Sequence, residues 1–339
     1  MRRRAAVLFV ASPVLLILAA TAAISVGTAA IPFDTVWAIV LDRLSPGLIH
    51  VSWPASRASI VWELRVPRAI LAILVGAGLG MAGTVMQGVT RNPLADPHLL
   101  GVSAGAALGA NVAILLTGHL LGPYTVPLFA FGGAMAATGI VILTARFAQT
   151  TGAAHLVLAG VATAFVVGSL GNVLIVVADP RAVASVVFWM LGGFGFAQWG
   201  NLGIPAAALL GCGLVFLANA RQLNGLAMGD ETATTLGIPV GALRTLLLVT
   251  NALLTGVMVA VSGMIGFVGL MMPHIARLMV GGDNRLVLPA AAILGALFLV
   301  VADIAARTLA APNDIPIGVV TGLVGGLCFV WLLRRASRP

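Results

Sequence analysis

Long apolar segments dominate the sequence: there are about ten, each near 20 residues long and almost free of charged side chains. Hydrophobic residues make up 60% of the chain and charged residues only 8%, which excludes a soluble globular domain. In lipid, every backbone polar group must be satisfied within its own segment, so segments of this kind fold as helices. We therefore predict an all-α, polytopic membrane protein of about ten transmembrane helices, forming a single domain over residues 1–339.

The predicted helices follow one another through mostly short polar connections. They lie at 5–28, 67–90, 98–117, 124–147, 154–177, 200–219, 240–261, 263–281, 286–306 and 315–334. The first helix follows three arginines, as in a signal peptide. Because its apolar run reaches Thr28 and further spans come after it, we interpret it as an uncleaved helix.

All 18 basic residues are arginines, and their distribution over the connections predicts the orientation of the chain. With Arg2, Arg3 and Arg4 placed in the cytoplasm, twelve arginines fall on the cytoplasmic side and six on the outer side. This bias follows the positive-inside rule, and an even number of spans then leaves both termini in the cytoplasm. The same rule explains most of the arginines behind the net charge of +8, so we expect membrane lipid and no nucleic acid as a partner.

Residues 65–101 contain the break around which we expect the chain to be organised. A glycine-rich apolar span from Ala69 to Val89 is followed by Arg91-Asn92-Pro93 and then by a second apolar segment. Because proline disfavours helix in the residue before it, this break predicts a tight turn between two spans. The turn is either a functional element or an ordinary proline-capped loop.

The same stretch recurs 180 residues later without a gap. The offset aligns Ala72 with Ala252, Leu74 with Leu254, Gly76 with Gly256, Gly83 with Gly263, Pro93 with Pro273 and Gly101 with Gly281. We infer two repeat halves, at roughly 65–180 and 240–339. Five spans in each half would make the repeat inverted in the membrane, a known transporter design in which the pathway lies between the halves.

The most polar connection, 220–239, is predicted to lie on the cytoplasmic side. It contains a short helix at about 228–237, in which Ala233 and Leu236 would share one face. The residues that mark the two ends of this helix are Asp230, Glu231, Gly237 and Pro239. The segment is either a solvated loop helix or an exposed element that a soluble motor protein grips.

Arginines also mark the predicted outer ends of two spans. Arg65 and Arg68 flank Pro67, and they present positive charge either to an acidic partner or to phospholipid headgroups. Arg307 follows Asp303 by four residues on the same helix face, so mutual neutralisation is the simplest interpretation of that pair.

Two further connections are predicted on the outer side. We expect 29–66 to be a long loop whose tryptophans lie at the membrane interface. The segment 178–199 is too interrupted by proline and glycine for a full span, and we expect a short helix lying against the bundle.

Residues that carry covalent or metal chemistry elsewhere are few and scattered here. Cys212 and Cys328 lie in apolar spans without metal-ligand spacing, so we interpret them as packing residues. His274 follows Pro273 and has no carboxylate four residues away, which favours a structural role over a proton relay. We predict no catalytic residue, no metal site and no cofactor bound by this chain.

Six sequence motifs closely resemble those of the permease subunits of ABC importers for iron–siderophores, haem and vitamin B12. In chain order they are RVPR at 65–68, Gln87 with RNPLADPHLLG at 91–101, LAMGDETATTLGIP at 226–239, GFVGLMMPHIARLMVGGDNR at 266–285, LPAAAILGALFLVVADIAAR at 288–307 and IPIGVVTGLVGG at 315–326. The resemblance covers nearly the whole chain. It implies a homodimer of ten-span subunits in the bacterial inner (cytoplasmic) membrane, with the pathway along the dimer axis. It also implies two cytoplasmic ATP-binding subunits, which would hold ATP and magnesium, and a periplasmic or lipoprotein substrate-binding protein.

The resemblance further implies roles for residues at matching positions. Acidic residues of the binding protein would be received by Arg65, Arg68 and Arg307. The coupling helix seated in the ATPase would contain Gly229, Asp230, Glu231, Ala233, Leu236 and Gly237. The cytoplasmic gate and pathway would contain Asn92, Leu94, Thr150 and Thr151.

The chain departs from the family pattern at two places near the last span. Asn313-Asp314 stands where the family usually has a glutamate, and Leu327-Cys328 follows Gly325-Gly326 where a proline is usual. Because the last span borders the pathway in this family, both departures weaken any inference about the substrate.

Three classes of function compete for this sequence. A P-loop needs a lysine and the chain has none, so as an ABC permease it depends on a separate ATPase. An ion-driven secondary transporter needs carboxylates within the membrane, and Asp303 is the only one in the predicted spans. A membrane enzyme needs a cluster of reactive groups, whereas His98 and His274 are isolated in the sequence. We therefore predict the permease subunit of an ATP-driven importer, with a ferric siderophore as the expected cargo and haem or cobalamin as alternatives.

Overall fold

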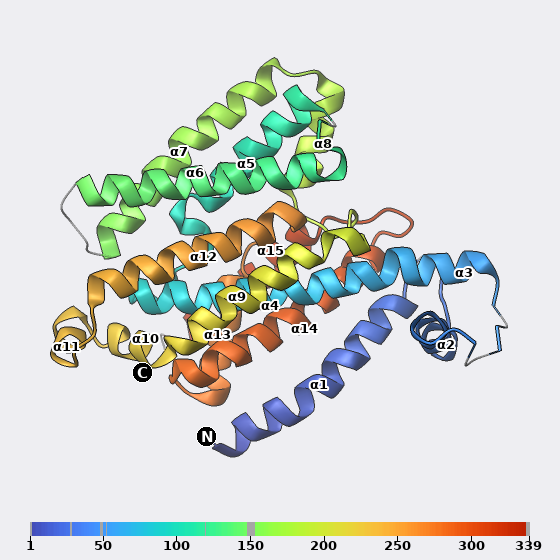
Figure 1. The fold of residues 1–339 in the computed structure, drawn as a ribbon, viewed down its shortest axis with the longest axis horizontal. Helices are drawn as coiled ribbons and strands as arrows, with labels where there is room; N and C mark the ends of the chain where they lie inside the picture. The colour runs from blue at the N-terminus through green and yellow to red at the C-terminus, as the bar shows by residue number, and fades with distance from the viewer. Residues whose placement is uncertain are drawn as a thin grey trace.

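The computed structural model describes residues 2–27, 29–47, 50–51, 53–118, 120–147 and 153–336. This part of the chain consists of helices and their connections, without any strand. Most helices run roughly along one long axis, with α11 at one end and α2, α3 and α8 toward the other (Figure 1).

The helices have the following bounds. Those at the ten predicted span positions are α1 (Arg2–Ser25), α4 (Val66–Thr90), α5 (Val102–Val112), α6 (Thr125–Phe147), α7 (Ala153–Val177), α9 (Gly203–Ala218), α12 (Val240–Ser262), α13 (Val268–Val280), α14 (Asn284–Thr308) and α15 (Ile317–Ala336). The other α-helices are α2 (Phe33–Leu44), α3 (Ala55–Ser59), α8 (Pro180–Met190), α10 (Ala220–Ala227) and α11 (Asp230–Thr235). Between them lie the π-helices η1 (Ile60–Arg65) and η3 (Ala113–Thr117) and the 3-10 helices η2 (Pro97–Leu100), η4 (Gly122–Tyr124) and η5 (Trp199–Asn201).

The predicted membrane-protein class is confirmed. Within the described residues, seven helices are long and apolar enough to cross a membrane, and three shorter apolar helices accompany them, at Val102–Thr117, Val268–Val280 and Ile317–Val330. These seven and three helices occupy the ten predicted positions. The short helix predicted within 178–199 is present as α8.

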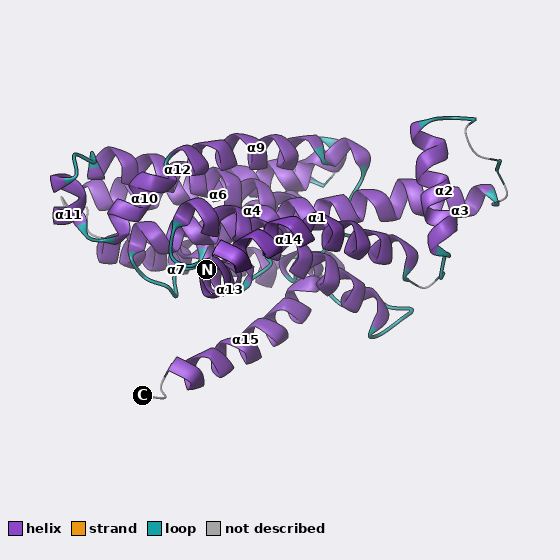
Figure 2. Ribbon diagram, turned by 90° about the horizontal axis from the view of Figure 1, so that it is seen from below, coloured by secondary structure: helices purple, strands orange, loops and turns teal. Residues whose placement is uncertain are grey.

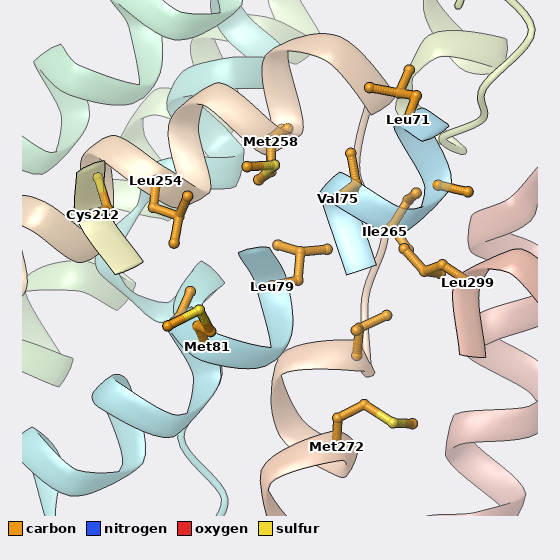
Figure 3. Packing of buried hydrophobic residues seen from close by; sticks show 14 of the residues in the cluster. Leu71, Val75, Leu79, Met81, Cys212, Leu254, Met258, Ile265, Met272 and Leu299 are labelled. Atoms are coloured by element: carbon orange, nitrogen blue, oxygen red, sulfur yellow. The ribbon is translucent and has the colours of Figure 1, made fainter. Parts of the chain in front are cut away.

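Helix α4 is the centre of the bundle. Every residue from Val75 to Thr90 is buried, and the helix packs against α12, α13 and α14. Figure 3 shows Val75 and Leu79 of α4 among apolar side chains of its neighbours, including Met258 and Leu299. Burial on all sides agrees with the sequence of α4, which is apolar or small around its whole circumference.

Glycines let the central helices approach one another closely. A Cβ atom at Gly83 would lie 1.8 Å from the carbonyl oxygen of Gly269 in α13. Gly76 of α4 and Gly295 of α14 face each other, and a Cβ atom on either would lie within 2.2 Å of the other's carbonyl oxygen. In a membrane such close packing takes the place of the missing hydrophobic drive between helices, and no side chain larger than hydrogen fits at these contacts.

The first outer connection differs from the prediction. Residues 29–66 are not a simple loop, because they contain α2, α3 and η1, and the last two continue directly into α4. The helical segment predicted at 67–90 therefore begins at Ala55. A tryptophan pair holds this extension: the Trp199 indole N–H donates to the Trp62 carbonyl at 2.8 Å, and the centroids of the two rings lie 4.7 Å apart.

The helix predicted at 263–281 begins five residues late, at Val268. The chain between α12 and α13 is not helical, and both Gly263 and Phe267 have positive φ angles, of 68°. The reason is tertiary: a Cβ atom at Gly263 would lie 2.1 Å from the carbonyl oxygen of Trp189, and the Ser262 carbonyl accepts a hydrogen bond from Gly193. The end of α8 therefore occupies the space into which α12 would continue.

The last helix leaves the bundle. Figure 2 shows α15 diverging from the other long helices along its length, with the start of the helix near the bundle. Ile317 and Thr321 near its start are buried, whereas Leu323 and Leu327 are exposed. The two repeat halves predicted from the offset of 180 residues stay a prediction; α4 passes through Gly83 without a break, while its counterpart α12 ends before Gly263.

Candidate functional site

Two groups of predicted residues lie toward opposite ends of the bundle. The outer arginine cluster consists of Arg65, Arg68 and Arg307 with Asp303 and Asp314. The coupling segment consists of α10 and α11, residues 220–237, and it packs on the other end of α4.

Arg65 and Arg307 both bind the end of α1. Arg65 donates to the carbonyl oxygens of Ile24 at 2.7 Å, Ser25 at 2.9 Å and Ala29 at 2.5 Å. Arg307 donates to the carbonyl oxygens of Ala23 at 2.7 Å and Val26 at 2.8 Å. The last carbonyls of a helix have no partner within the helix and carry a partial negative charge, so two guanidinium groups satisfy and neutralise this helix end.

Asp303 joins two of the arginines. Its carboxylate accepts from Arg307 Nε at 3.0 Å and from Arg68 Nε at 2.8 Å, and its side chain is only 1% exposed. Arg68 also donates to Asp314 at 2.9 Å, and the Asp314 side chain is half exposed. Asp314 belongs to the Asn313-Asp314 segment, which stands where a glutamate is usual. The segment therefore still supplies a carboxylate, and this carboxylate pairs with Arg68.

The structure therefore brings the three predicted docking arginines together but commits them to internal acceptors. Arg65 and Arg307 are each 8% exposed, and their N–H groups point to α1 and Asp303. Only Arg68, on the side of Asp314, reaches the surface of the cluster. Their role in docking stays a prediction, and the geometry limits a direct contact to Arg68.

The coupling segment is attached to the bundle by α10. Leu223 of α10 fills the space over Gly88 of α4. Asn224 donates to Asp283 at 2.8 Å and accepts from the backbone N–H of Asn284, the first residue of α14. Hydrogen bonds from Arg285 hold the pKa of Asp283 well below its usual range, so this carboxylate stays charged at the start of α14.

Helix α11 begins at Asp230, as the sequence predicts, but it ends before the predicted 237, and one predicted feature is wrong. Ala233 is completely buried, whereas Leu236 is 63% exposed, so the two residues do not share a face. The reason is that α11 ends at Thr235, and Leu236 lies beyond it where the chain turns at Gly237, whose φ is +77°. An open hollow beside α11 is lined by Asp230, Glu231, Thr234, Thr235 and Val240.

The predicted gate residues are only partly described. Asn92 and Leu94 are both exposed in the turn after α4, and the Asn92 side chain accepts a hydrogen bond from the Leu94 backbone N–H. Thr150 and Thr151 lie outside the described residues. The assignment of these residues to a gate stays a prediction.

Sequence reasoning missed a set of polar contacts, most of which join distant segments. Arg277 of α13 donates to the Gln87 side chain, which in turn donates to the Leu270 carbonyl at 3.1 Å. His98 is hydrogen-bonded to the Ser103 hydroxyl and also to the Ile265 carbonyl at 3.2 Å. No spacing rule links residues so far apart; the presence of Gln87 and His98 beside the proline-rich turn was the only signal.

The described residues contain no cluster of histidine, cysteine or carboxylate that could hold a metal ion. Cys212 is buried, Cys328 is half-buried, and both are free thiols, with Cys212 in the apolar core. The described part of the chain thus supplies packing, two ion pairs on the buried Asp303 and a small exposed helix.

The described residues thus form a polytopic helical bundle with a polar, helix-bearing segment at one end. The comparisons with known proteins make this class specific. The model of the FecCD transport family matches residues 15–335, so the chain belongs to the FecCD transport family.

Relatives along most of the chain agree with this. The hemin transport system permease HmuU of Yersinia pestis is 40% identical, over 88% of this chain and 92% of its own. The vitamin B12 import permease BtuC of Salmonella paratyphi A is 38% identical, over 87% of this chain and 89% of its own. A solved structure described as a metal-chelate type ABC transporter in an inward-facing conformation is 29% identical, with a TM-score of 0.82 over 97% and 99% of the two chains. The chain is therefore a multi-pass ABC importer permease.

Proposed function

We propose that this chain is the permease through which a bacterial ABC importer moves a metal chelate into the cytoplasm. The observation that carries the proposal is the short exposed helix α11, built through α10 onto the buried central helix α4 in a FecCD-type fold. Haem is the first cargo to test, because the relatives include a hemin permease and a vitamin B12 permease. A ferric siderophore, expected from the sequence, and cobalamin are the alternatives.

The proposed assembly is a homodimer with two ATP-binding subunits, which hold ATP and magnesium and grip α11. A substrate-binding protein docks at the opposite end. The start of α1, the end of α15 and α11 lie toward one end of the bundle (Figure 1), which supports an orientation in the inner membrane with both termini in the cytoplasm.

The contact with the ATPase can be tested at Glu231. This exposed carboxylate lines the open hollow beside α11, and within the described residues it forms no ion pair. We expect Glu231→Lys to reduce the amount of ATPase that co-purifies with the permease about tenfold, because it reverses a charge at the interface. Glu63→Lys is the matched control, an exposed carboxylate at the other end of the molecule. ATPase recovery equal to that of the unchanged protein would rule out α11 as the docking helix.

Docking of the binding protein can be tested at Arg68. Arg68→Gln removes the partly exposed cation of the outer cluster and leaves Asp303 paired with Arg307. If an acidic residue of the binding protein contacts Arg68, the dissociation constant of that complex rises about tenfold. The control is Arg57→Gln, an exposed arginine of α3. An unchanged dissociation constant for Arg68→Gln, with thermal stability retained, would exclude the docking role.

A further inference from the structure

Asp230 and Glu231 are neighbours on α11 but face different surroundings. The Asp230 carboxylate accepts from Arg244 Nη2 at 2.8 Å and lies 3.6 Å from Arg91 Nη2. Arg244 is 4% exposed at the start of α12, so its side chain fixes Asp230 against the bundle. Glu231 is exposed, lines the open hollow beside α11 together with Asp230, and forms no ion pair within the described residues.

Arg91 is the residue at which the central helix ends. It forms the C-cap of α4 in the left-handed conformation, with a φ of 53°, and directly precedes Asn92 and Leu94. Its guanidinium group lies beside the start of α11, where a Cβ atom at Gly229 would be 3.7 Å from Arg91 Nη1. The backbone that ends α4 and the side chain that reaches α11 thus belong to one residue.

The two contacts of Asp230 connect three segments far apart in the sequence. Arg244 ties α11 to α12, and Arg91 ties α11 to the turn at residues 91–96. The Arg91–Asp230 pair is partly exposed, with both side chains about 40% accessible, so its contribution to stability is small. A weak contact at this place can break and form again as α11 moves.

We propose that the Arg91–Asp230 ion pair transmits movement of α11 to the turn at residues 91–96, with Arg91 as the positioning residue. Arg244 holds Asp230 in place, and Glu231 is left to contact the ATPase. The inference rests on the proposed function, because it needs an ATPase that moves α11.

The test uses the complete transporter in lipid nanodiscs, with its ATPase and binding protein. A cysteine introduced by Leu94→Cys reports on the turn. The two free cysteines are removed by Cys212→Ala and Cys328→Ala, so that only the new cysteine is labelled. The measurement is the ratio of the maleimide-labelling rates of this cysteine with ATP plus vanadate and without nucleotide. The variants are Arg91→Gln, Arg91→Lys, Asp230→Asn and the double variant Arg91→Gln/Asp230→Asn. Arg221→Gln, an exposed arginine of α10, is the matched control.

We expect Arg91→Gln to change the ratio of labelling rates by about two- to five-fold, toward one. A change of this size is what the loss of one exposed ion pair produces. Arg91→Lys keeps the charge and keeps the ratio, and Arg221→Gln leaves it unchanged. Because Arg91→Gln and Asp230→Asn both break the Arg91–Asp230 contact, their effects in the double variant do not add.

Three results would overturn the inference. The labelling ratio could be unchanged in Arg91→Gln, or the effects of Arg91→Gln and Asp230→Asn could add independently. The ratio could also equal one in the Leu94→Cys protein that keeps both Arg91 and Asp230. Co-purification of the ATPase is measured in every sample. Failure of the unchanged chain to bind any ATPase contradicts the proposed function instead, so the two failures are distinguishable.

Discussion

Asp303 shows how single charged residues are tolerated inside this apolar fold. Its carboxylate is almost completely buried but accepts hydrogen bonds from Arg68 and Arg307, and Arg307 in turn donates to the end of α1. A buried charge is tolerated when its partners and hydrogen bonds are complete, and removal of one partner leaves the others uncompensated. The buried part of the cluster therefore depends on Asp303.

Replacing Asp303 by asparagine tests this dependence. The change leaves the buried Arg307 guanidinium without a carboxylate, so we expect the free energy of unfolding to fall by about 3–5 kcal/mol. Thermal unfolding in detergent measures it. Asp314→Asn is the matched control, because Asp314 pairs with the same Arg68 but is half exposed, and the expected loss is below about 1 kcal/mol. Equal losses in the two variants would contradict the account of the cluster.

The i, i+4 spacing of Asp303 and Arg307 predicted their pairing, and the structure confirms it. The sequence did not predict that Arg65 and Arg307 close the end of α1, because those contacts join residues 40 to 284 positions apart. Residue spacing along one helix determines which side chains are neighbours on that helix. Which residue of another helix a side chain contacts depends on how the helices pack.

At the scale of the elements, helix positions were predictable and several helix ends were not. Apolar length alone places the helices, since an apolar segment in lipid has no other way to satisfy its backbone. Helix α12 ends at Ser262 because the end of α8 lies against Gly263, and α4 is extended backward by η1 and α3. Contacts of this kind are invisible in a hydropathy pattern. Leu236 was assigned to the wrong side for a related reason, since α11 is shorter than the predicted segment.

The close approach of α4 and α13 gives a prediction at this scale. Gly83→Ala places a methyl group 1.8 Å from the Gly269 carbonyl oxygen, so the two backbones have to separate, and we expect a loss of about 1–3 kcal/mol of stability. Gly132→Ala in α6 is the control: its Cβ atom meets open space, and alanine favours helix by about 0.5–1 kcal/mol. Thermal unfolding of the two variants is compared in the same detergent. A Gly83→Ala variant as stable as the unchanged protein would show that this contact does not limit helix packing.

At the scale of the whole molecule, the sequence predicted the class, the helical architecture and the family. Three of the motifs coincide with the places described above. The motif at 65–68 lies in the outer arginine cluster, the motif at 91–101 begins in the turn after α4, and the motif at 226–239 overlaps the coupling segment. The cargo could not be predicted in the same way. The family resemblance implies that the last span borders the pathway, but α15 diverges from the bundle (Figure 2), and its described side chains up to Val330 are mostly apolar, which does not distinguish one cargo from another.

The measurement that most directly tests the account is uptake into vesicles that contain this chain, its ATPase and its binding protein. Labelled haem, ferric siderophore and cobalamin are offered in parallel. In one set of vesicles ATP is supplied on the side of the ATPase, and in a second set only on the opposite side. A third set receives no ATP but an imposed proton or sodium gradient. We expect one of the three to accumulate only when ATP reaches the ATPase. Accumulation without ATP, driven by the ion gradient, would contradict the account and make Asp303 and His274 the residues to examine as coupling sites.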